Sequence, residues 1–347
     1  MIRFISPWRL RALGVVGMNQ RNGQIIAVHN RRRDYPKVDN KLITKKLAEQ
    51  AGLTVPQLFD EIRTHHDIHH WPRNIPQGRG FVIKPAHGAG GDGILVIKSQ
   101  RRDEYIRASG RRITRAAIDD HLSNILSGMY SLGGRPDTAL IEYRVDFSDR
   151  FADLSWNGVP DIRTVVYQGF PIMAMMRLPT QASDGKANLH QGAVGVGIDI
   201  ASGATCGGVQ YNQPIDLHPD TEQPVAGRKI DDWTPLLRLA AGCHELAGLG
   251  YLGVDVVLDE IHGPMILELN ARPGLAIQIA NRHGLGPRLK TVDRYLRHHP
   301  KPTDPAIRVA LARQWTAAWN DDREPEHRQL QTDAIEHDVP PPAAKTA

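Results

Sequence analysis

The sequence predicts an α+β protein whose sheets are mainly antiparallel, and three segments carry this prediction. Residues 251–274 contain two β-branched and aliphatic runs, LGVDVVL and PMILELN, joined by a polar turn, which indicates a β-hairpin. Residues 81–98 place two further apolar runs on either side of a glycine-rich turn. Residues 234–249 carry apolar side chains three and four positions apart, which is typical of an amphipathic helix.

The remaining elements follow in chain order. Residues 1–37 form an arm with turn signals, residues 39–58 predict a helix that stops at Gly52, and residues 65–80 predict a polar loop. The loop contains the histidine-rich string HHDIHH, which is open to a metal-binding interpretation, but nearby prolines favour a solvated loop. We further expect a helix at 116–132, strands at 138–145, 161–178 and 189–200, and a disordered polar tail from about residue 318.

Length and composition are those of a globular protein with two or three structural units. The chain has 347 residues, of which 41% are hydrophobic and 23% charged. No apolar run approaches the length of a membrane span, and the basic start lacks the pattern of a cleaved signal peptide. Cys206 and Cys243 show no metal or redox spacing, so a reducing, cytoplasmic compartment is expected.

The charge balance indicates anionic partners. The net charge is +5, and arginines are dense in residues 29–37 and 100–115. Nucleic acid, nucleotide phosphates and an acidic protein substrate all fit such a charge. Single-stranded nucleic acid is usually bound with interleaved aromatic side chains, and only 6% of the residues are aromatic. Nucleic acid is therefore the disfavoured partner.

The predicted hairpin at 251–274 brings three oxygen-bearing side chains together. Because side chains alternate along a strand, Glu268 and Asn270 share one face, and Asp255 joins them if it pairs near Glu268. A buried acid needs compensation, and Mg²⁺ binds one or two carboxylates together with substrate phosphates. A half-exposed hairpin whose acids face water is the open alternative.

The glycine-rich turn FVIKPAHGAGGDGILVIK is the second cluster with a chemical signal. Glycine lets backbone N–H groups approach phosphate oxygens closely. Dinucleotide and Walker-type phosphate loops lead from a strand into a helix, whereas this turn leads into a second strand, so both are excluded. We expect a flap between antiparallel strands, with Lys84 placed to reach a phosphate; a merely flexible hairpin loop is the alternative. The glycines are Gly88, Gly90, Gly91 and Gly93.

Other polar side chains lie at predicted strand ends and in one loop. Asp161 and Arg163 share a strand face and Arg177 ends the next strand; singly, such arginines are more often ion-pair partners than catalytic groups. Arg272 follows Asn270 by two residues and is expected on the carboxylate side, where a cation would offset charge on a phosphorylated carboxyl group. Further candidates are Glu142, Tyr143, Lys186, Asn188 and His190.

Taken in order, these motifs resemble the ATP-grasp superfamily, in which two α+β subdomains with mainly antiparallel sheets grip ATP between them. Within it, the chain is similar to the α-L-glutamate ligase-related proteins, kin of the ligase that adds glutamates to a ribosomal protein tail. The resemblance runs from about Val38 to about Leu289 and is carried by VDNKLITKK, FVIKPAHGAGGDGI, GVPDIRTVV, DGKANLHQG and LELNARPGLAIQ.

The resemblance implies a metal site, a set of arginines that act on the substrate, and a nucleotide site. The metal, Mg²⁺ with Mn²⁺ as the alternative, would be bound by Asp255, Glu268 and Asn270. The catalytic arginines would be Arg163, Arg177 and Arg272. ATP would be held by Lys41, Lys84, His87, Gly88, Gly90, Gly91, Gly93, Glu142, Tyr143, Asp161, Lys186 and Asn188.

It also implies an activity and a division into domains. The activity is ATP-dependent carboxylate–amine ligation through an acyl phosphate, adding glutamate or another amino acid to a peptide, protein or small-molecule acceptor. Residues 1–37 stand where such ligases carry a substrate domain, 38–145 would form the small subdomain, 146–295 the large one, and 296–347 an extension. The short arm and an extra stretch at 144–160 leave the acceptor open. An ATP-binding module that needs a partner protein is the second hypothesis, and homo-oligomerisation stays open.

Overall fold

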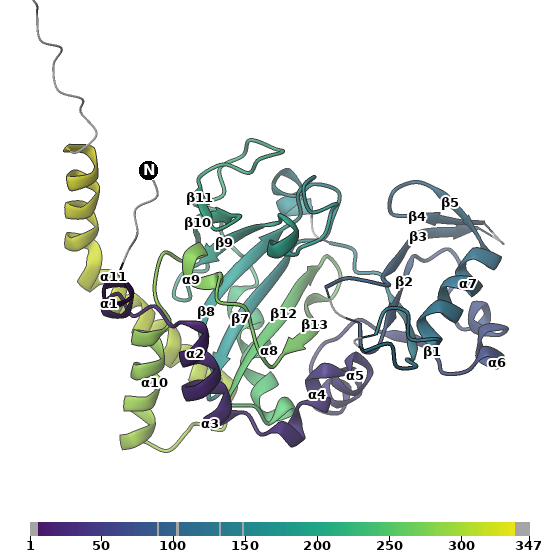
Figure 1. Ribbon diagram of the computed structural model, residues 1–347, viewed down its shortest axis with the longest axis horizontal. Coiled ribbons are helices and arrows are strands. Elements are labelled where there is room, and N and C mark those ends of the chain that lie inside the picture. Colours follow the sequence, from purple (N-terminus) through teal and green to yellow (C-terminus); the bar gives the residue numbers. More distant parts are fainter. Residues whose placement is uncertain (1–5, 89, 102–103, 132, 148, 337–347) are drawn as a thin grey trace, which may run out of the picture.

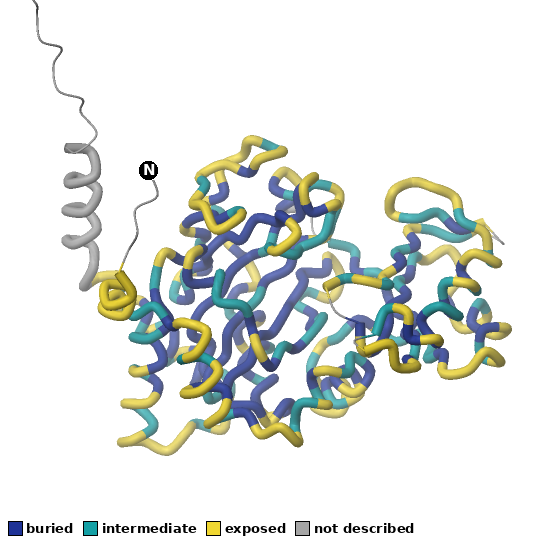
Figure 2. Tube along the Cα trace, in the orientation of Figure 1, coloured by how far each residue is buried: buried dark blue, intermediate teal, exposed yellow. Residues whose placement is uncertain are grey.

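Two lobes, each built on its own antiparallel sheet, lie side by side in the computed structural model of the chain (Figure 1). The structure describes residues 6–88, 90–101, 104–131, 133–147 and 149–336, apart from the side chains of 149–150 and 322–336. Both sheets are largely buried, and exposed residues lie mainly in the turns and on the outer helices (Figure 2). The predicted α+β class with mainly antiparallel sheets is confirmed.

The smaller lobe is a six-stranded sheet in the order β1-β6-β2-β3-β4-β5, packed against α7. Phe81 and Ile83 alternate along β2 and are fully buried against Ile118 and Leu122 of α7. The expected strand–flap–strand unit is present, because β2 and β3 pair in antiparallel register on either side of the glycines. The elements are β1 (Leu58–Ile62), α6 (His65–Ile68), η3 (Trp71–Arg73), β2 (Phe81–Pro85), β3 (Leu95–Arg101), β4 (Glu104–Arg107), β5 (Arg112–Thr114), α7 (Arg115–Leu126) and β6 (Ala139–Tyr143).

The expectation of a solvated loop at residues 65–80 is wrong in part. The four histidines of HHDIHH are exposed, but the segment forms the short helices α6 and η3. Trp71 is fully buried, with its ring 5.6 Å from each of the rings of Phe81 and Tyr105. Its indole Nε1 donates to Asp119 at 2.7 Å, which satisfies the one polar atom of the ring. Trp71 is therefore part of the core of the smaller lobe, which the polar composition of the segment did not indicate.

The larger lobe is a seven-stranded sheet in the order β11-β10-β9-β8-β7-β12-β13. One face packs on α8 and the first part of α11, and the other on α9, α10 and the N-terminal arm (Figure 1). The elements are η4 (Asp149–Leu154), β7 (Asp161–Tyr167), β8 (Phe170–Leu178), η5 (Leu189–Gln191), β9 (Val194–Ile198), β10 (Thr205–Gln210), β11 (Gln213–Ile215), α8 (Trp233–Ala247), β12 (Tyr251–Asp259), β13 (Gly263–Asn270), α9 (Ile277–Ala280), α10 (Gly286–His298) and α11 (Pro305–Glu336).

The N-terminal arm lies on the larger lobe and leads into a helix beside the flap. Asn30 ties it to the sheet by donating to the carbonyl oxygens of Tyr251 (2.7 Å) and Ala271 (3.2 Å). Asn40 caps α5 by accepting from the backbone N–H groups of Leu42 and Ile43. The elements are α1 (Pro7–Ala12), α2 (Met18–Gln20), η1 (Arg21–Ile26), α3 (Ala27–His29), η2 (Arg32–Asp34), α4 (Pro36–Asp39) and α5 (Lys41–Gln50).

The C-terminal segment departs from the expectation of disorder. Helix α11 continues to Glu336, and residues 337–347 lie outside the described part of the chain. The start of the helix is anchored by Arg308, which is fully buried and donates from Nε to the carbonyl oxygen of Gly169 at 3.0 Å and from Nη2 to Glu245 at 2.8 Å. Among the described residues, no helix is long and apolar enough to cross a bilayer.

Candidate active site

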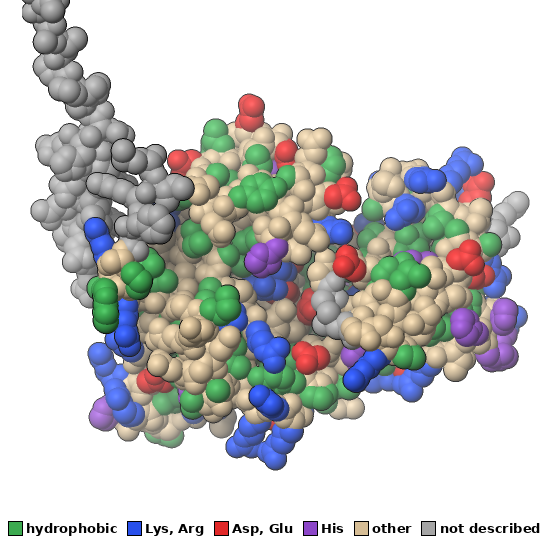
Figure 3. Space-filling model, viewed as in Figure 1, with side chains coloured by type: hydrophobic (Ala, Val, Ile, Leu, Met, Phe, Trp, Pro, Cys, Tyr) green, Lys and Arg blue, Asp and Glu red, His purple; other side chains and the backbone are tan. Residues whose placement is uncertain are grey.

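Strands β7, β8, β12 and β13 present one polar face toward the smaller lobe. Asp255 of β12 stands opposite Glu268 of β13 on one side and Arg163 of β7 on the other. Asp161 of β7 stands opposite Arg177 of β8. Residues directly opposite in an antiparallel pair share a face, so the sheet register brings these groups together. Acidic and basic side chains meet in the hollow between the lobes (Figure 3).

Asp255 is the centre of this face. Its side chain is 2% exposed and accepts from Arg163 Nε at 2.7 Å and Nη2 at 2.6 Å, and from Arg177 Nη2 at 2.7 Å. Asn270 Nδ2 adds a bond of 3.2 Å. Burial alone would raise the pKa of this carboxyl group, but the charges of Arg163 and Arg177 outweigh burial and lower the pKa to about 2. Asp255 is therefore an anion at neutral pH.

Asp161 shares Arg177 with Asp255 but has the opposite pKa shift. Burial and the nearby Asp255 charge raise the pKa of Asp161 to about 6, although Arg177 donates to both of its oxygens. The two carboxylates in turn raise the pKa of Arg177 above its usual value in spite of its burial. Arg177 thus carries a full charge, and the pKa of Asp161 lies closer to neutrality than the pKa of Asp255.

The structure gives the arginines partners other than those expected of them. Arg163 and Arg177 were predicted to bind a substrate carboxylate or a developing oxyanion, but their guanidinium groups are bonded to Asp255 and Asp161. They hold the carboxylates in place instead. Arg272 is exposed, and its guanidinium lies over the ring of Tyr35, 5.2 Å from the centroid, rather than on the carboxylates.

Glu268 and Asn270 supply the accessible oxygen atoms. The Glu268 side chain is 35% exposed, and its Oε1 lies 3.5 Å from Lys41 Nζ. Asn270 donates its amide N–H to Asp255, which leaves its Oδ1 as an acceptor. Each carboxylate oxygen has two lone pairs, and Asp255 Oδ1 accepts only from Arg163 Nε within the described residues. The set therefore fits a hard cation such as Mg²⁺ through Glu268, Asn270 and the remaining position on Asp255.

The smaller lobe contributes a buried carboxylate between two lysines. Glu142 of β6 lies 2.5 Å from Lys84 Nζ and 2.8 Å from Lys45 Nζ, and all three side chains are less than a tenth exposed. Burial raises the pKa of Glu142, but Lys84 and Lys45 outweigh it, so the pKa stays below its usual value. Burial lowers the pKa of Lys45, and Glu142 counteracts that effect. The cluster thus contains two basic side chains and one acidic side chain.

Lys45 was missed in the sequence, although a signal was present. It lies four residues after Lys41 on α5, so the two side chains occupy neighbouring positions on one helix face. Tyr143, the other residue expected near the nucleotide, donates its hydroxyl group to Asp259 at 3.0 Å. Asp259 also accepts from the backbone N–H of Asp146, and thereby ties the crossing between the lobes to the turn of the β12–β13 hairpin.

The glycine flap is held at its base. Lys41 Nζ donates to the carbonyl oxygen of Gly88 at 2.5 Å, and so connects the flap with the Glu268 side chain. His87 Nδ1 bonds to Asp137 at 2.7 Å, and Asp137 also accepts from Ser131 at 2.8 Å. The flap glycines Gly90, Gly91 and Gly93 have φ of +67°, +83° and +76°, which side-chain-bearing residues rarely adopt.

A second loop, residues 183–192, meets this flap. A Cβ added at Gly90 would lie 3.9 Å from Asn188 Nδ2, and one at Gly91 would lie 3.8 Å from Lys186 Cδ. Lys186 Nζ is 3.8 Å from Asp92, and both side chains are partly exposed. The glycine flap and the Lys186 loop, which were both expected to bind ATP, thus lie next to each other although they belong to different lobes. A partly exposed lysine therefore lies beside the glycine backbone of the flap, and glycine backbone with a nearby cation is a combination that can bind phosphate.

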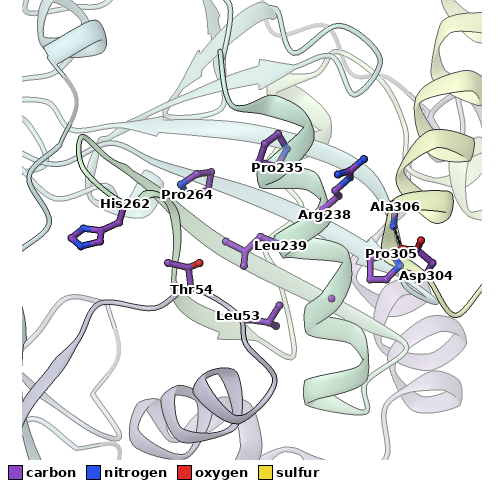
Figure 4. Close-up of a pocket in the computed structure, with 11 residues that line it drawn as sticks. Leu53, Thr54, Pro235, Arg238, Leu239, His262, Pro264, Asp304, Pro305 and Ala306 are labelled. Atoms are coloured by element: carbon purple, nitrogen blue, oxygen red, sulfur yellow. Dashed lines mark hydrogen bonds between the residues drawn. The ribbon is translucent and has the colours of Figure 1, made fainter.

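A separate pocket of about 550 Å³ lies outside this region (Figure 4). It is lined by α8, the beginning of α11, the turn of the β12–β13 hairpin, and the segment that follows α5. Arg238 of α8 and Asp304 bring opposite charges to its wall, and His262 lies at one end. None of the predicted nucleotide, metal or arginine residues lines it.

Comparisons with known proteins agree with this arrangement. Residues 20–294 match the family described as sugar-transfer associated ATP-grasp. The glutathione biosynthesis bifunctional protein GshAB of Mannheimia succiniciproducens is 22% identical over 273 residues, which are 73% of this chain and 34% of that protein. The chain thus spans about a third of that relative.

Similar solved structures include the D-cycloserine synthetase DcsG and the ATP-grasp ligase PsnB complexed with minimal precursor. DcsG has a TM-score of 0.43 at 15% identity, over 76% of this chain and 71% of that chain. PsnB has a TM-score of 0.40 at 13% identity, over 76% of this chain and 62% of that chain.

The two-lobed fold and the family match define an ATP-grasp protein, as the motifs predicted. Within that superfamily, the chain belongs to the sugar-transfer associated ATP-grasp family, whose match covers most of its length. The narrower similarity to glutamate ligases has loose support, from the glutathione biosynthesis relative alone among these comparisons.

Proposed function

We propose that this protein is an ATP- and Mg²⁺-dependent carboxylate–amine ligase. The observation that carries the proposal is the meeting of two features in one hollow. One is the polar sheet face with Asp255, Glu268 and Asn270. The other is the contact between the glycine flap and the Lys186 loop. The family match supports ATP as the nucleotide.

In the proposed reaction, an oxygen of a substrate carboxylate attacks the γ-phosphorus of ATP, and the bond to the β,γ-bridging oxygen breaks to release ADP. The product is an acyl phosphate. An amine then attacks the acyl carbon, phosphate leaves, and the amine loses a proton to give an amide. Such a reaction needs little covalent participation by the protein, so positioning and charge neutralisation are its main contributions.

Each part of the site has a role in this scheme. Lys186 and the amides of the flap hold the phosphates, and Lys41 positions the flap against Glu268. Lys84 presents positive charge below the flap while Glu142 fixes its direction. Mg²⁺, or Mn²⁺ in its place, would be held by Glu268, Asn270 and Asp255 and would neutralise charge on the phosphates when bound.

Arg163 and Arg177 act as positioning residues in this proposal. They orient Asp255 and keep it ionised, because each guanidinium donates to that carboxylate. The cation that binds the substrate carboxylate must therefore come from another group, and Arg272 would have to leave the ring of Tyr35 to serve. Glutamate or another amino acid joined to a peptide, protein or small-molecule acceptor is the substrate class that we propose.

ADP release in the presence of ATP, Mg²⁺ and pools of amino acids or peptides tests the proposal. We expect carboxylate-dependent ADP release from the wild-type protein and its loss in Glu268→Ala, with an unchanged melting temperature. A matched control is Glu260→Ala, at an exposed position in the turn of the same hairpin. Normal turnover in Glu268→Ala would contradict the metal assignment.

The second candidate is an ATP-binding module that needs a partner protein to complete the acceptor site. It is favoured by the engagement of Arg163 and Arg177 with acidic side chains, which leaves neither guanidinium group directed at a substrate. Tight ATP binding without ADP release for any acid or peptide would support this candidate over the ligase.

A further inference from the structure

Positive charge is concentrated in the N-terminal arm. Residues 1–37 contain eight lysines and arginines and one acidic residue, a net charge of +7. The other residues contain 35 basic and 37 acidic side chains, a net charge of −2. The whole positive excess of the protein therefore lies in about a tenth of its length. Such an asymmetry within one chain indicates an anionic surface as the partner of that segment.

Exposed apolar side chains gather on the same arm. Trp8, Leu13, Met18 and Val28 are 78%, 60%, 65% and 66% exposed, and Leu10 is 37% exposed. Nine other large apolar side chains are exposed in the described part of the chain, and they are spread singly between residues 43 and 307. Single exposed apolar residues are ordinary, whereas a group among cations marks an interaction site. Apolar and basic side chains are interspersed over α1 and α2 at the edge of the larger lobe (Figure 3).

This surface is preformed rather than part of a loose tail. The backbone N–H of Val16 donates to Gln278 Oε1 at 2.9 Å, and Gln278 Nε2 donates back to the Val16 carbonyl oxygen at 3.0 Å. Ile25 and Ile26 are buried against the sheet. Helix α1, by contrast, buries none of its residues and begins with a Ser6 cap. Some apolar side chains of the arm are thus buried in the core, whereas others are exposed on its surface.

We propose that the N-terminal arm docks on an anionic lipid bilayer. Trp8, Leu10 and Leu13 enter the boundary between headgroups and acyl chains, while Arg9 and Arg11 extend to the lipid phosphates. An anionic bilayer offers an apolar interior and a negatively charged surface. The arm has exposed apolar side chains for the first and basic side chains for the second. A nucleic acid duplex offers phosphates but leaves leucine side chains in water. Among the described residues, Arg9 and Arg11 form no ion pair.

Sedimentation with vesicles tests this proposal on the full chain. We compare vesicles of phosphatidylcholine alone with vesicles that contain about one third phosphatidylglycerol. The protein should bind the second kind only, and binding should weaken as salt rises. Arg9→Ala with Arg11→Ala should reduce the partition coefficient about 30-fold, since each basic residue contributes on the order of 1 kcal/mol at such a surface. Trp8→Ala should reduce it about tenfold.

Matched controls keep the result specific. Arg111→Ala with Arg112→Ala removes two exposed cations at the start of β5, and Tyr211→Ala removes an aromatic side chain that is 59% exposed. Both controls should bind vesicles like the wild type, and all variants should keep their melting temperature and nucleotide binding, because α1 is far from the hollow between the lobes (Figure 1).

Three outcomes would overturn the proposal: no vesicle binding, an equal loss in the control variants, or displacement by a duplex oligonucleotide with no effect of Trp8→Ala. The last outcome would assign the arm to nucleic acid.

Discussion

Replacing Glu142 by glutamine should strongly destabilise the protein, because this carboxylate is the anion between two buried ammonium groups. Lys84 and Lys45 lie 2.5 and 2.8 Å from its oxygens, and its side chain is 4% exposed. Glutamine keeps the shape and removes the charge, so both lysines lose their buried counter-ion. Removing one partner of a buried ion pair costs about 3–5 kcal/mol.

The expected shift of the melting temperature follows from the size of the chain. At about 2.1 cal/mol/K per residue, the entropy of unfolding is about 0.7 kcal/mol/K, so the melting temperature should fall by about 4–7 °C. Thermal unfolding followed by circular dichroism measures this shift. Glu104→Gln is the control, since that side chain is 64% exposed and its change should cost less than about 0.5 kcal/mol.

Two further observations separate a charge effect from a packing effect. Adding Lys45→Met to the Glu142→Gln variant should recover part of the lost stability, because one uncompensated charge is removed. The pKa of Lys45 is already lowered by burial, so the destabilisation by Glu142→Gln should also shrink at alkaline pH, where that lysine loses its proton. An unchanged melting temperature in Glu142→Gln, or no recovery in the double variant, would show that Glu142 is not the buried counter-ion of the two lysines.

Three other predictions follow from the site. The pKa of Asp161 is raised from 3.8 to about 6 in the folded state, so the contribution of this group to stability is full below about pH 4 and is lost as the pH rises through 6. We therefore expect the wild type to lose stability relative to Asp161→Asn over this pH range. Urea titrations of both proteins measure the difference between their free energies of unfolding. Gly93→Ala should destabilise more than Gly110→Ala: both glycines have positive φ, but only at Gly93 would a Cβ meet Tyr130, at 2.6 Å, and parallel thermal melts measure the difference. Lys186→Ala should weaken ATP binding about tenfold in calorimetry, whereas Lys229→Ala should not.

The sequence was sufficient where the signal was local. Alternation along β13 placed Glu268 and Asn270 on one face, and the turn composition set the hairpin that brought Asp255 opposite Glu268. The flap was also recognisable, because glycines between two apolar runs leave few alternatives. These features depend on residues fewer than twenty positions apart, so no long-range pairing had to be known.

The roles of the arginines could not be read in the same way. Arg163 is 92 positions from Asp255, and only the pairing of β7 with β12 makes them neighbours. The sequence therefore indicated that cations were present but not that acids engaged them. The role of Lys45 was not evident for a similar reason. Its partner Glu142 is far away along the chain, on strand β6 of the smaller lobe.

The prediction of a disordered tail from about residue 318 rested on composition alone. Residues 318–336 are polar, which favoured disorder, whereas the structure continues α11 through them to Glu336. The buried Arg308 and Val309 at the start of α11 anchor the helix on the larger lobe. Trp71 illustrates the opposite error, in which one buried aromatic side chain orders a segment of polar neighbours.

In the proposed function, Glu268, Asn270 and Asp255 form the metal end of a nucleotide site. Electron paramagnetic resonance of Mn²⁺, titrated in the presence and absence of ADP, tests it most directly, because the readout needs no knowledge of the substrate. The wild-type protein and Glu260→Ala should bind Mn²⁺ more tightly with ADP than without it. Glu268→Ala should lose that ADP-dependent affinity by about tenfold or more. Equal Mn²⁺ binding by Glu268→Ala and the wild type would show that Glu268 is not a metal ligand.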